Sequence, residues 1–389
     1  MTQMVYWCNS IKAGADKGMA ERPVLRTELC ARLGIEYPIC LAGMGGKADP
    51  TPPQLVAAVS NAGGLGVMGG TGFSPEEIRA RINQIRALTD KPFGVDLLLP
   101  VSMAEVGDSR PEIREQLARE FPRHVEFVQS LAREFNLPQV TASDDTVLSP
   151  AVIREQVKVV LEEKVPVFAA ALGDPSWMVP DAKAAGITVM GMVGAVRHAR
   201  RQIEAGVDIV VAQGYEAGGH TGRAANFPLI PQVVDAISPA PVIAAGGIAD
   251  GRGVAAALAL GAVGAWVGTA FLVSEETGIV DLHQQQILDG STLDFIVTRA
   301  YTGKTARDYK NVVIQAWENS DLEPLSMPLQ QVLMEDFVEA ASQAGRHELV
   351  NNPAGQIGGM LTERKPAAAI MDELIQGAVN VIKSFRSVI

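Results

Sequence analysis

Short, continuously apolar runs recur along the chain, and each ends at glycine or polar residues. The segments between them carry apolar residues at helical spacing, and several open with proline, which suits the first turn of a helix. Strands buried on both faces of a parallel sheet are apolar throughout, so this alternation predicts repeated strand-helix units. We expect eight strands, at residues 39–44, 65–69, 93–99, 165–172, 188–193, 209–213, 242–246 and 265–271.

Helical patterns lie between these strands, at residues 53–62, 75–88, 180–185, 195–205, 227–237 and 251–260. Eight parallel strands that alternate with helices predict an α/β fold of the TIM-type (β/α)8 barrel class.

The connection after the third strand is longer, and it holds two further helical patterns at 111–135 and 150–164. After residue 276 the pattern changes to helices and polar loops. The predicted organisation is therefore a flexible N-terminal extension (1–22), a barrel (23–276) with an insertion at about 101–164 over one mouth, and a C-terminal helical region (277–389) near the same mouth.

One uncharged stretch, 254–273, is about as long as a membrane span. Gly261 and Gly264 divide it into an Ala/Leu-rich half and a Val/Trp-rich half. We therefore expect a buried helix and strand of the barrel, not a membrane helix.

Composition narrows the class of function. With 47% apolar and 20% charged residues, the chain resembles a soluble globular protein, and its net charge of −11 disfavours nucleic acid and membrane partners. Three cysteines without Cys-x-x-Cys spacing, and a start that lacks a secretion signal, predict a reducing, cytoplasmic location. A small-molecule substrate is expected; the oligomeric state stays open, with a dimer as one option.

A histidine in a glycine-rich turn is the candidate catalytic residue. His220 lies in the turn 214–222, which follows the apolar run 209–212 and contains four glycines. Such a turn lets backbone N–H groups approach a flat or anionic ligand, and histidine exchanges protons near neutral pH. Taken alone, the motif is equally consistent with a tight strand-to-helix turn whose histidine bonds locally.

The other histidines are less suited to chemistry. His198 is expected on a helix face, and His124, His283 and His347 lie in helical or polar surroundings where a solvated histidine is usual. Neither a His-x-x-x-His pair nor a Gly-x-Ser-x-Gly turn occurs, so no metal site and no serine-hydrolase site are expected.

Further candidates lie at strand ends, because barrels bind ligands there and hold phosphate after their last two strands. Small residues after the first strand leave room for a planar ring, and Asp96, which interrupts the third run, is expected to find a donor partner. The amides that end the seventh and eighth strands are candidate anion ligands, at Ala245, Gly246, Gly247, Gly268 and Thr269.

Several of these motifs together resemble the flavin-dependent nitronate monooxygenases (2-nitropropane dioxygenase-like enzymes), which are related to FMN-dependent enoyl-acyl carrier protein reductases. The resemblance covers about residues 33–276, and a weaker similarity is present at 354–359. The segments that carry it are 42–44, 60–66, 216–222, 244–251 and 267–269.

The resemblance implies noncovalent FMN, with its isoalloxazine ring near Ala42, Gly43 and Met44. It places the phosphate at the five anion candidates above. Further cofactor contacts are implied at Asp96, Gln213, Gly218 and Gly219. Two positions depart from relatives: Asp96 stands where the family often has asparagine or threonine, and Met192 where some members have lysine.

His220 matches the family's catalytic histidine, which implies a base that acts on the carbon beside a nitro group. The implied reaction is oxidation of alkyl nitronates with O2 to carbonyl compounds and nitrite. Two alternatives stay open: NAD(P)H-dependent reduction of an enoyl thioester or a quinone, and a noncatalytic flavin- or phosphate-binding barrel.

Overall fold

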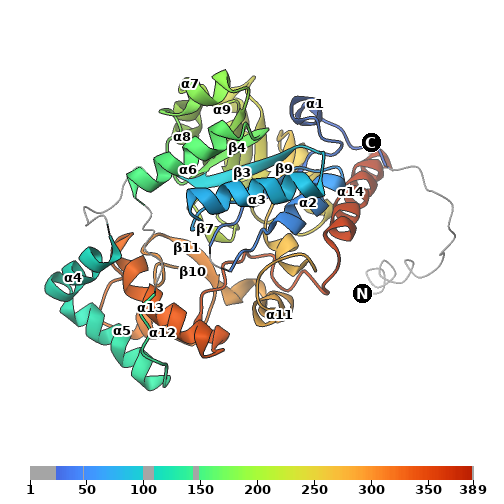
Figure 1. Cartoon of the computed structure of the whole chain (residues 1–389). Coiled ribbons are helices and arrows are strands. Elements are labelled where there is room, and N and C mark those ends of the chain that lie inside the picture. The colour runs from blue at the N-terminus through green and yellow to red at the C-terminus, as the bar shows by residue number, and fades with distance from the viewer. Residues whose placement is uncertain (1–22, 47, 100–108, 143–148, 388–389) are drawn as a thin grey trace, which may run out of the picture.

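Eight parallel strands form one sheet with the order β1-β9-β8-β6-β5-β4-β3-β2 in a computed structural model that describes residues 23–46, 48–99, 109–142 and 149–387. A bridge between Cys40 and Leu65 joins the two outer strands, so the sheet closes into a barrel (Figure 1). The predicted fold class is confirmed. The strands are β1 (Ile39–Leu41), β2 (Gly66–Gly69), β3 (Phe93–Leu98), β4 (Val167–Ala171), β5 (Thr188–Val193), β6 (Ile209–Gln213), β8 (Val242–Ala245) and β9 (Gly264–Val267).

Helices cover the outside of this barrel, and local sequence explains where several begin. Helix α3 opens with a capping box, in which the side chains of Ser74 and Glu77 each accept a hydrogen bond from the other's backbone amide. Pro75 occupies the first helical position, directly after Ser74. The outward side chains of the strands pack beneath the helices in the main apolar core. The covering helices are α2 (Pro53–Asn61), α3 (Pro75–Leu88), α6 (Pro150–Glu162), α7 (Val179–Ala184), α8 (Val196–Glu204), α9 (Asn226–Ile237) and α10 (Gly251–Ala259). The short helix α1 (Glu28–Leu33) instead packs its apolar side chains against the interior of the barrel.

The uncharged stretch 254–273 contains the end of α10, all of β9 and the short 3-10 helix η1 (Thr269–Val273). The eighth strand therefore ends at Val267, earlier than the pattern predicted. Within the described residues, no helix is both long enough and apolar enough to cross a membrane.

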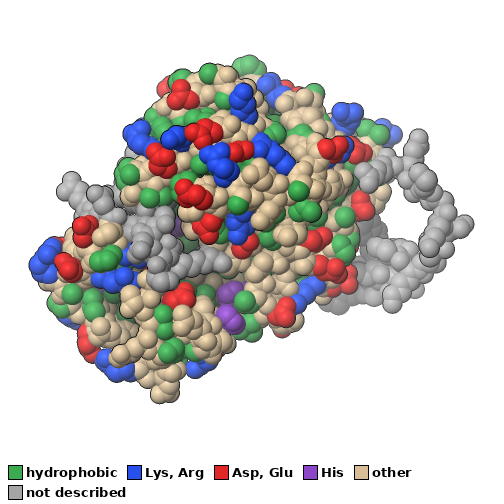
Figure 2. Space-filling model, viewed as in Figure 1, with side chains coloured by type: hydrophobic (Ala, Val, Ile, Leu, Met, Phe, Trp, Pro, Cys, Tyr) green, Lys and Arg blue, Asp and Glu red, His purple; other side chains and the backbone are tan. Residues whose placement is uncertain are grey.

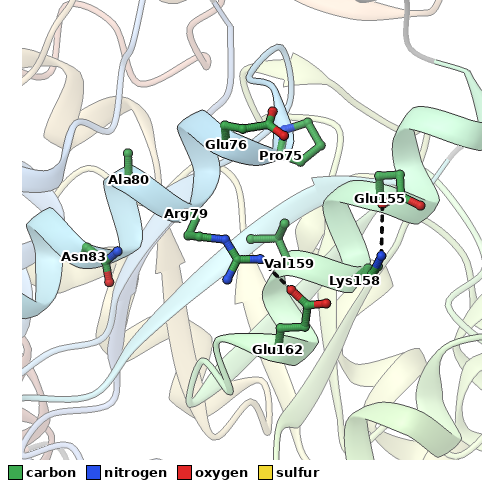
Figure 3. A pocket seen from close by; sticks show the side chains of 9 residues that line it. All are labelled: Pro75, Glu76, Arg79, Ala80, Asn83, Glu155, Lys158, Val159 and Glu162. Atoms are coloured by element: carbon green, nitrogen blue, oxygen red, sulfur yellow. Dashed lines mark hydrogen bonds and ion pairs between the residues drawn. The ribbon is translucent and has the colours of Figure 1, made fainter.

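Helix α6 corrects the predicted insertion. It packs on α3 and β3 and forms the ordinary connection between β3 and β4, so the inserted part is shorter than 101–164. Arg79 of α3 pairs with Glu162 of α6 at 2.5 Å, across a surface hollow lined by charged side chains (Figure 3). In the space-filling view, basic and acidic side chains intermix over this face of the barrel (Figure 2). The hollow holds none of the predicted site residues.

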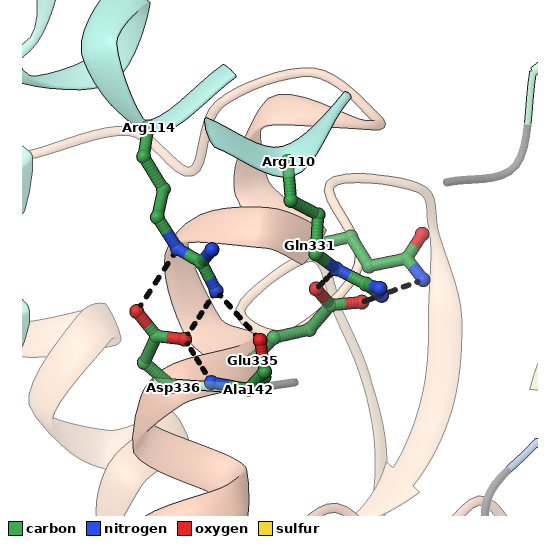
Figure 4. A network of polar contacts seen from close by, with 6 residues as sticks. All are labelled: Arg110, Arg114, Ala142, Gln331, Glu335 and Asp336. Carbon is green, nitrogen blue, oxygen red and sulfur yellow. Dashed lines mark hydrogen bonds and ion pairs between the residues drawn. The ribbon is translucent and has the colours of Figure 1, made fainter. Parts of the chain in front are cut away.

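The inserted helices join the C-terminal region in a second lobe with its own apolar core (Figure 1). Phe121 and Pro122 split the predicted helix 111–135 into α4 (Arg110–Glu120) and α5 (Pro122–Glu134), which pack on α13 (Leu329–Gln343). Arg114 pairs with Asp336 at 2.6 Å, and Arg110 forms a paired contact with Glu335 (Figure 4). The insertion expected over the barrel mouth thus forms part of this second lobe.

The C-terminal region also differs from an all-helical expectation. It contains α11 (Asp281–Asp289), α12 (Val312–Asn319) and two strands, β10 (Phe295–Thr298) and β11 (Ala306–Tyr309). These strands form a small antiparallel sheet with β7 (Gly219–His220), which lies between the barrel and the lobe (Figure 1). The last helix, α14 (Ala367–Ser384), packs against α10 and α2 on the barrel wall.

Candidate functional site

The barrel interior is lined by side chains that alternate inward along the strands. Most of them form one apolar cluster. Strand register places Gly69, Asp96 and Ala169 side by side and Gln213 beside Ala245, so Asp96 and Gln213 bring polar groups into this lining near its carboxyl-end rim.

The end of the first strand lies against the end of the last one. A Cβ atom on Gly268 would lie 3.5 Å from the Cβ of Ala42 and 3.6 Å from the Sδ of Met44. On the other side, a Cβ atom on Gly43 would lie 2.3 Å from the Cβ of Asp96. The predicted ring-binding segment 42–44 therefore bridges the ends of β9 and β3, and Gly43 has no room for a side chain.

Thr51 holds this segment in place, and the sequence analysis missed it. Its fully buried Oγ1 donates to the carbonyl of Met44 at 3.0 Å and accepts from the amide of Gly69 at 2.9 Å. One hydroxyl thus ties together the ends of the first two strands. A single threonine at the start of a helix carries no sequence signal of that role.

The ends of β8 and β9 form a cradle of backbone amides. Within the described part of the chain, the N–H groups of Gly246, Gly247, Gly268 and Thr269 donate no hydrogen bond to protein atoms. Gly246 and Gly247 have positive φ angles of 95° and 72°, a conformation that favours glycine. Unpaired amides beside the start of α10 are suited to an anion.

The segment 353–356 from the C-terminal region lies against this cradle. The amide of Gly355 donates to Thr269 Oγ1 at 2.8 Å, and the amide of Gln356 donates to the carbonyl of Glu216 at 3.0 Å. A Cβ atom on Gly218 would lie 2.6 Å from the carbonyl carbon of Ala354, so this close approach requires glycine. The weak motif at 354–359 signalled this contact, although it was not among the predicted site residues.

His220 lies on β7, where it is paired with Ala306 of β11. Its Nε2 lies 3.3 Å from the Oγ1 of Thr302, and its carbonyl accepts a hydrogen bond of 2.8 Å from the Nε2 of Gln213. Burial, helped by the positive charge of Lys304, lowers the pKa of His220 to about 4. The imidazole is therefore neutral at physiological pH.

A buried arginine fixes the turn that leads to His220. The guanidinium of Arg307, 1% exposed, donates to the carbonyl oxygens of Tyr215 at 2.8 Å and Phe295 at 2.5 Å. It also lies 4.4 Å from the centre of the Tyr215 ring. Arg307 thus joins the small sheet to the turn 214–222, a role that sequence reasoning also missed.

The other histidines lie away from the rim. His124 bonds the carbonyl of Glu323 at 3.0 Å, and His198 lies on α8 beside Arg197. The expectation of a solvated His283 was wrong, because this side chain is 4% exposed and bonds the carbonyl of His347 at 3.1 Å. Among the described residues, no group of three or more His, Cys, Asp or Glu side chains could hold a metal ion.

Asp96 departs from its expected environment. The side chain is 5% exposed, and its Oδ1 has no hydrogen-bond partner within the described part of the chain. The predicted donor partner is therefore missing for this oxygen. Burial raises the pKa of the carboxyl group well above its ordinary value.

A closed (β/α)8 barrel whose rim brings together an amide cradle and a half-buried histidine is the arrangement of a ligand site in a barrel enzyme. The family model for nitronate monooxygenase matches residues 26–377. A Staphylococcus aureus protein named "Probable nitronate monooxygenase" is 33% identical over 372 residues, which are 93% of this chain and 99% of the relative.

Two solved structures extend the similarity. Nitroalkane oxidase from Streptomyces ansochromogenes is 28% identical with a TM-score of 0.78, covering 90% of this chain and 98% of its own. FabK from Thermotoga maritima is 32% identical with a TM-score of 0.74, covering 94% and 100%. The chain belongs to the nitronate monooxygenase family, and it is an oxidoreductase.

Proposed function

We propose that this protein is an FMN-dependent monooxygenase that oxidises alkyl nitronates with O2 to carbonyl compounds and nitrite. The observation that carries the proposal is the position of His220, a half-buried imidazole 3.3 Å from Thr302 Oγ1 whose backbone carbonyl accepts a hydrogen bond from Gln213 at the end of β6. His220 lies at the same rim as the amide cradle. Gln213, which pairs with Ala245 in register, donates to the carbonyl of His220, and the segment 353–356 contacts both the turn 214–222 and the cradle. Family membership supports the reaction class.

The residues at the rim fit FMN. The unpaired amides of Gly246, Gly247, Gly268 and Thr269 would hold its phosphate, and Ala42, Gly43 and Met44 would lie along its ring. Asp96, Gln213, Gly218, Gly219 and Ala245 complete the proposed set. When bound, FMN would supply the electron-transfer chemistry that couples nitronate oxidation to O2.

Within this site, His220 would act as the base that takes up the proton of the substrate. Thr302 Oγ1 lies 3.2 Å from the carbonyl of Lys304, to which it can donate, and it then accepts from the Nε2–H of His220. That arrangement leaves Nδ1 as the lone-pair nitrogen. When the substrate arrives as the neutral nitroalkane, His220 would first remove the proton from the carbon beside the nitro group with Nδ1, which gives the nitronate that is oxidised.

The direct test is the visible spectrum of the purified protein, followed by anaerobic titrations with propyl nitronate and with NADH in separate cuvettes. A flavin spectrum that bleaches with the nitronate supports the proposal. A colourless protein that takes up no FMN contradicts it.

The similarity to FabK favours a second candidate, an NAD(P)H-dependent reductase of an enoyl thioester or a quinone. Bleaching by NADH without any response to the nitronate would establish that candidate instead.

Replacing Gly246 with alanine is expected to weaken FMN binding by at least about tenfold. The new Cβ atom would lie 3.0 Å from the amide of Ala217, and φ is 95° at this position. The matched control is Gly186→Ala, where φ is also positive, at 75°, but nothing lies within 4 Å of the new atom. FMN titration of the two apoproteins measures the effect; equal affinities in both variants would remove Gly246 from the cradle.

The pH dependence of turnover should depend on Lys304. With a neutral nitroalkane as substrate, kcat/KM of the wild-type protein is expected to fall only as pH drops towards about 4, where His220 is protonated. In Lys304→Gln this fall should begin at higher pH, because one of the two causes of the lowered pKa is removed. Lys310→Gln, which loses an exposed pair with Glu318, is the control. Identical acid limbs in wild type and Lys304→Gln would contradict the assignment.

A further inference from the structure

Asp96 lies in a pocket of small and apolar residues at the rim. It faces Gly69 of β2 and Ala169 of β4 in register, and Gly43 packs directly on its Cβ. The two strands beside it, β2 and β4, carry no titratable side chain, and the thiol of Cys40 on β1 is kept neutral by burial, which raises its pKa. No charged group among the described residues compensates an ionised carboxyl here, and burial is the one cause of its pKa shift.

An isolated buried carboxylate is costly, so the favoured form of Asp96 is the neutral acid. A neutral carboxyl group has one O–H donor, whereas a carboxylate only accepts. Asparagine has nearly the same shape and donates through its side-chain amide without a charge.

We propose that Asp96 is a neutral carboxylic acid whose O–H donates a hydrogen bond to the isoalloxazine ring of FMN. The inference rests on the proposed function for the presence of FMN. It specifies the protonation state and the role of this residue. The ring is the expected acceptor because it carries carbonyl and nitrogen acceptors, and because Asp96 touches Gly43 of the proposed ring-binding segment. Asp96 would thus be a cofactor-positioning residue.

The test compares Asp96→Asn, which keeps a donor without a charge, with Asp96→Leu, which has similar size and no polar group. FMN fluorescence titration of the apoproteins should give Asp96→Asn an affinity close to wild type and Asp96→Leu an affinity at least about tenfold weaker, the usual effect of an unpaired buried polar group. Leucine that binds as well as aspartate would overturn the inference. So would asparagine that binds about tenfold more tightly, since that result indicates a repelling carboxylate.

Infrared difference spectroscopy supplies a second readout. The spectrum of wild type minus Asp96→Asn at neutral pH should contain the carbonyl stretch of a protonated carboxylic acid; carboxylate bands alone would overturn the inference. This measurement decides the protonation state even if Asp96→Leu fails to fold. None of these readouts depends on turnover. A protein that binds FMN as described but does not oxidise nitronates would therefore contradict the proposed function and leave the role of Asp96 supported.

Discussion

His220→Asn is expected to lower kcat/KM for a neutral nitroalkane by about 100- to 10,000-fold, the range that a positioned general base contributes. Asparagine retains a polar side chain that can contact Thr302, but it cannot take up a proton near neutral pH. A preformed nitronate has already lost the proton, so its oxidation should fall much less. The ratio of the two losses isolates proton removal from every other function of the site.

Steady-state rates with the same nitro compound, supplied either as the neutral acid or as the nitronate, make this comparison. His124→Asn is the matched control, because His124 is a half-buried histidine of the second lobe that bonds a backbone carbonyl. FMN content should stay at the wild-type level in both variants. Equal losses for the two substrate forms would show that His220 does not act as the base, and full activity would exclude it from the mechanism.

The barrel could be predicted from the sequence because its strands are buried on both faces. The runs 188–193 and 209–213 match β5 and β6 residue for residue. A short, continuously apolar run must be buried on both faces, and a central strand of a parallel sheet provides that burial. Gly246 shows what a glycine at a strand end can signal, because its φ is 95° and a Cβ atom there would lie 3.0 Å from the amide of Ala217, whereas Gly268 has only ordinary contacts at 3.5 and 3.6 Å; the role of both as phosphate ligands stays a prediction.

The second lobe shows where pattern reasoning fails. Strand β11 has Arg307 and Asp308 at its centre, and such a pair looks like exposed loop in sequence. Both are buried, at 1% and 2%, because partners for this short strand come from β7 and β10, distant in the chain. The surroundings of His220 were missed for the same reason, since Thr302 and Lys304 come from a region that the pattern described as helices and loops.

Asp96 shows a third limit. The sequence showed that it interrupts the apolar third run, but it lies within β3 and not at its end, and the expected donor partner for Oδ1 is missing in the described structure. The rule that buried carboxylates are paired presumes an ionised group. A buried carboxyl group can instead keep its proton and remain neutral. Sequence alone does not distinguish a paired carboxylate from a neutral acid.

The largest expected effect on stability belongs to Asp308, which lies 2% exposed with an unpartnered Oδ1 in the described structure. Burial raises its pKa from 3.8 to about 7, although a hydrogen bond with Asn351 opposes the shift. Below the unfolded-state pKa, both states hold the proton. As pH rises from about 4 to about 7, the unfolded chain ionises while the folded protein does not, so stability is lost through this window.

Asp308→Asn should therefore gain stability relative to wild type as pH rises, by about 4 kcal/mol in total between about pH 4 and pH 7. Asparagine fills the same space and cannot ionise, so the pH-dependent cost disappears. Urea unfolding of the apoproteins across this range measures the difference, with Asp90→Asn as the control because its side chain is 88% exposed. If the wild-type and Asp308→Asn curves run parallel from pH 4 to pH 8, Asp308 titrates normally in the folded protein and the buried acid does not cause the loss of stability between about pH 4 and pH 7.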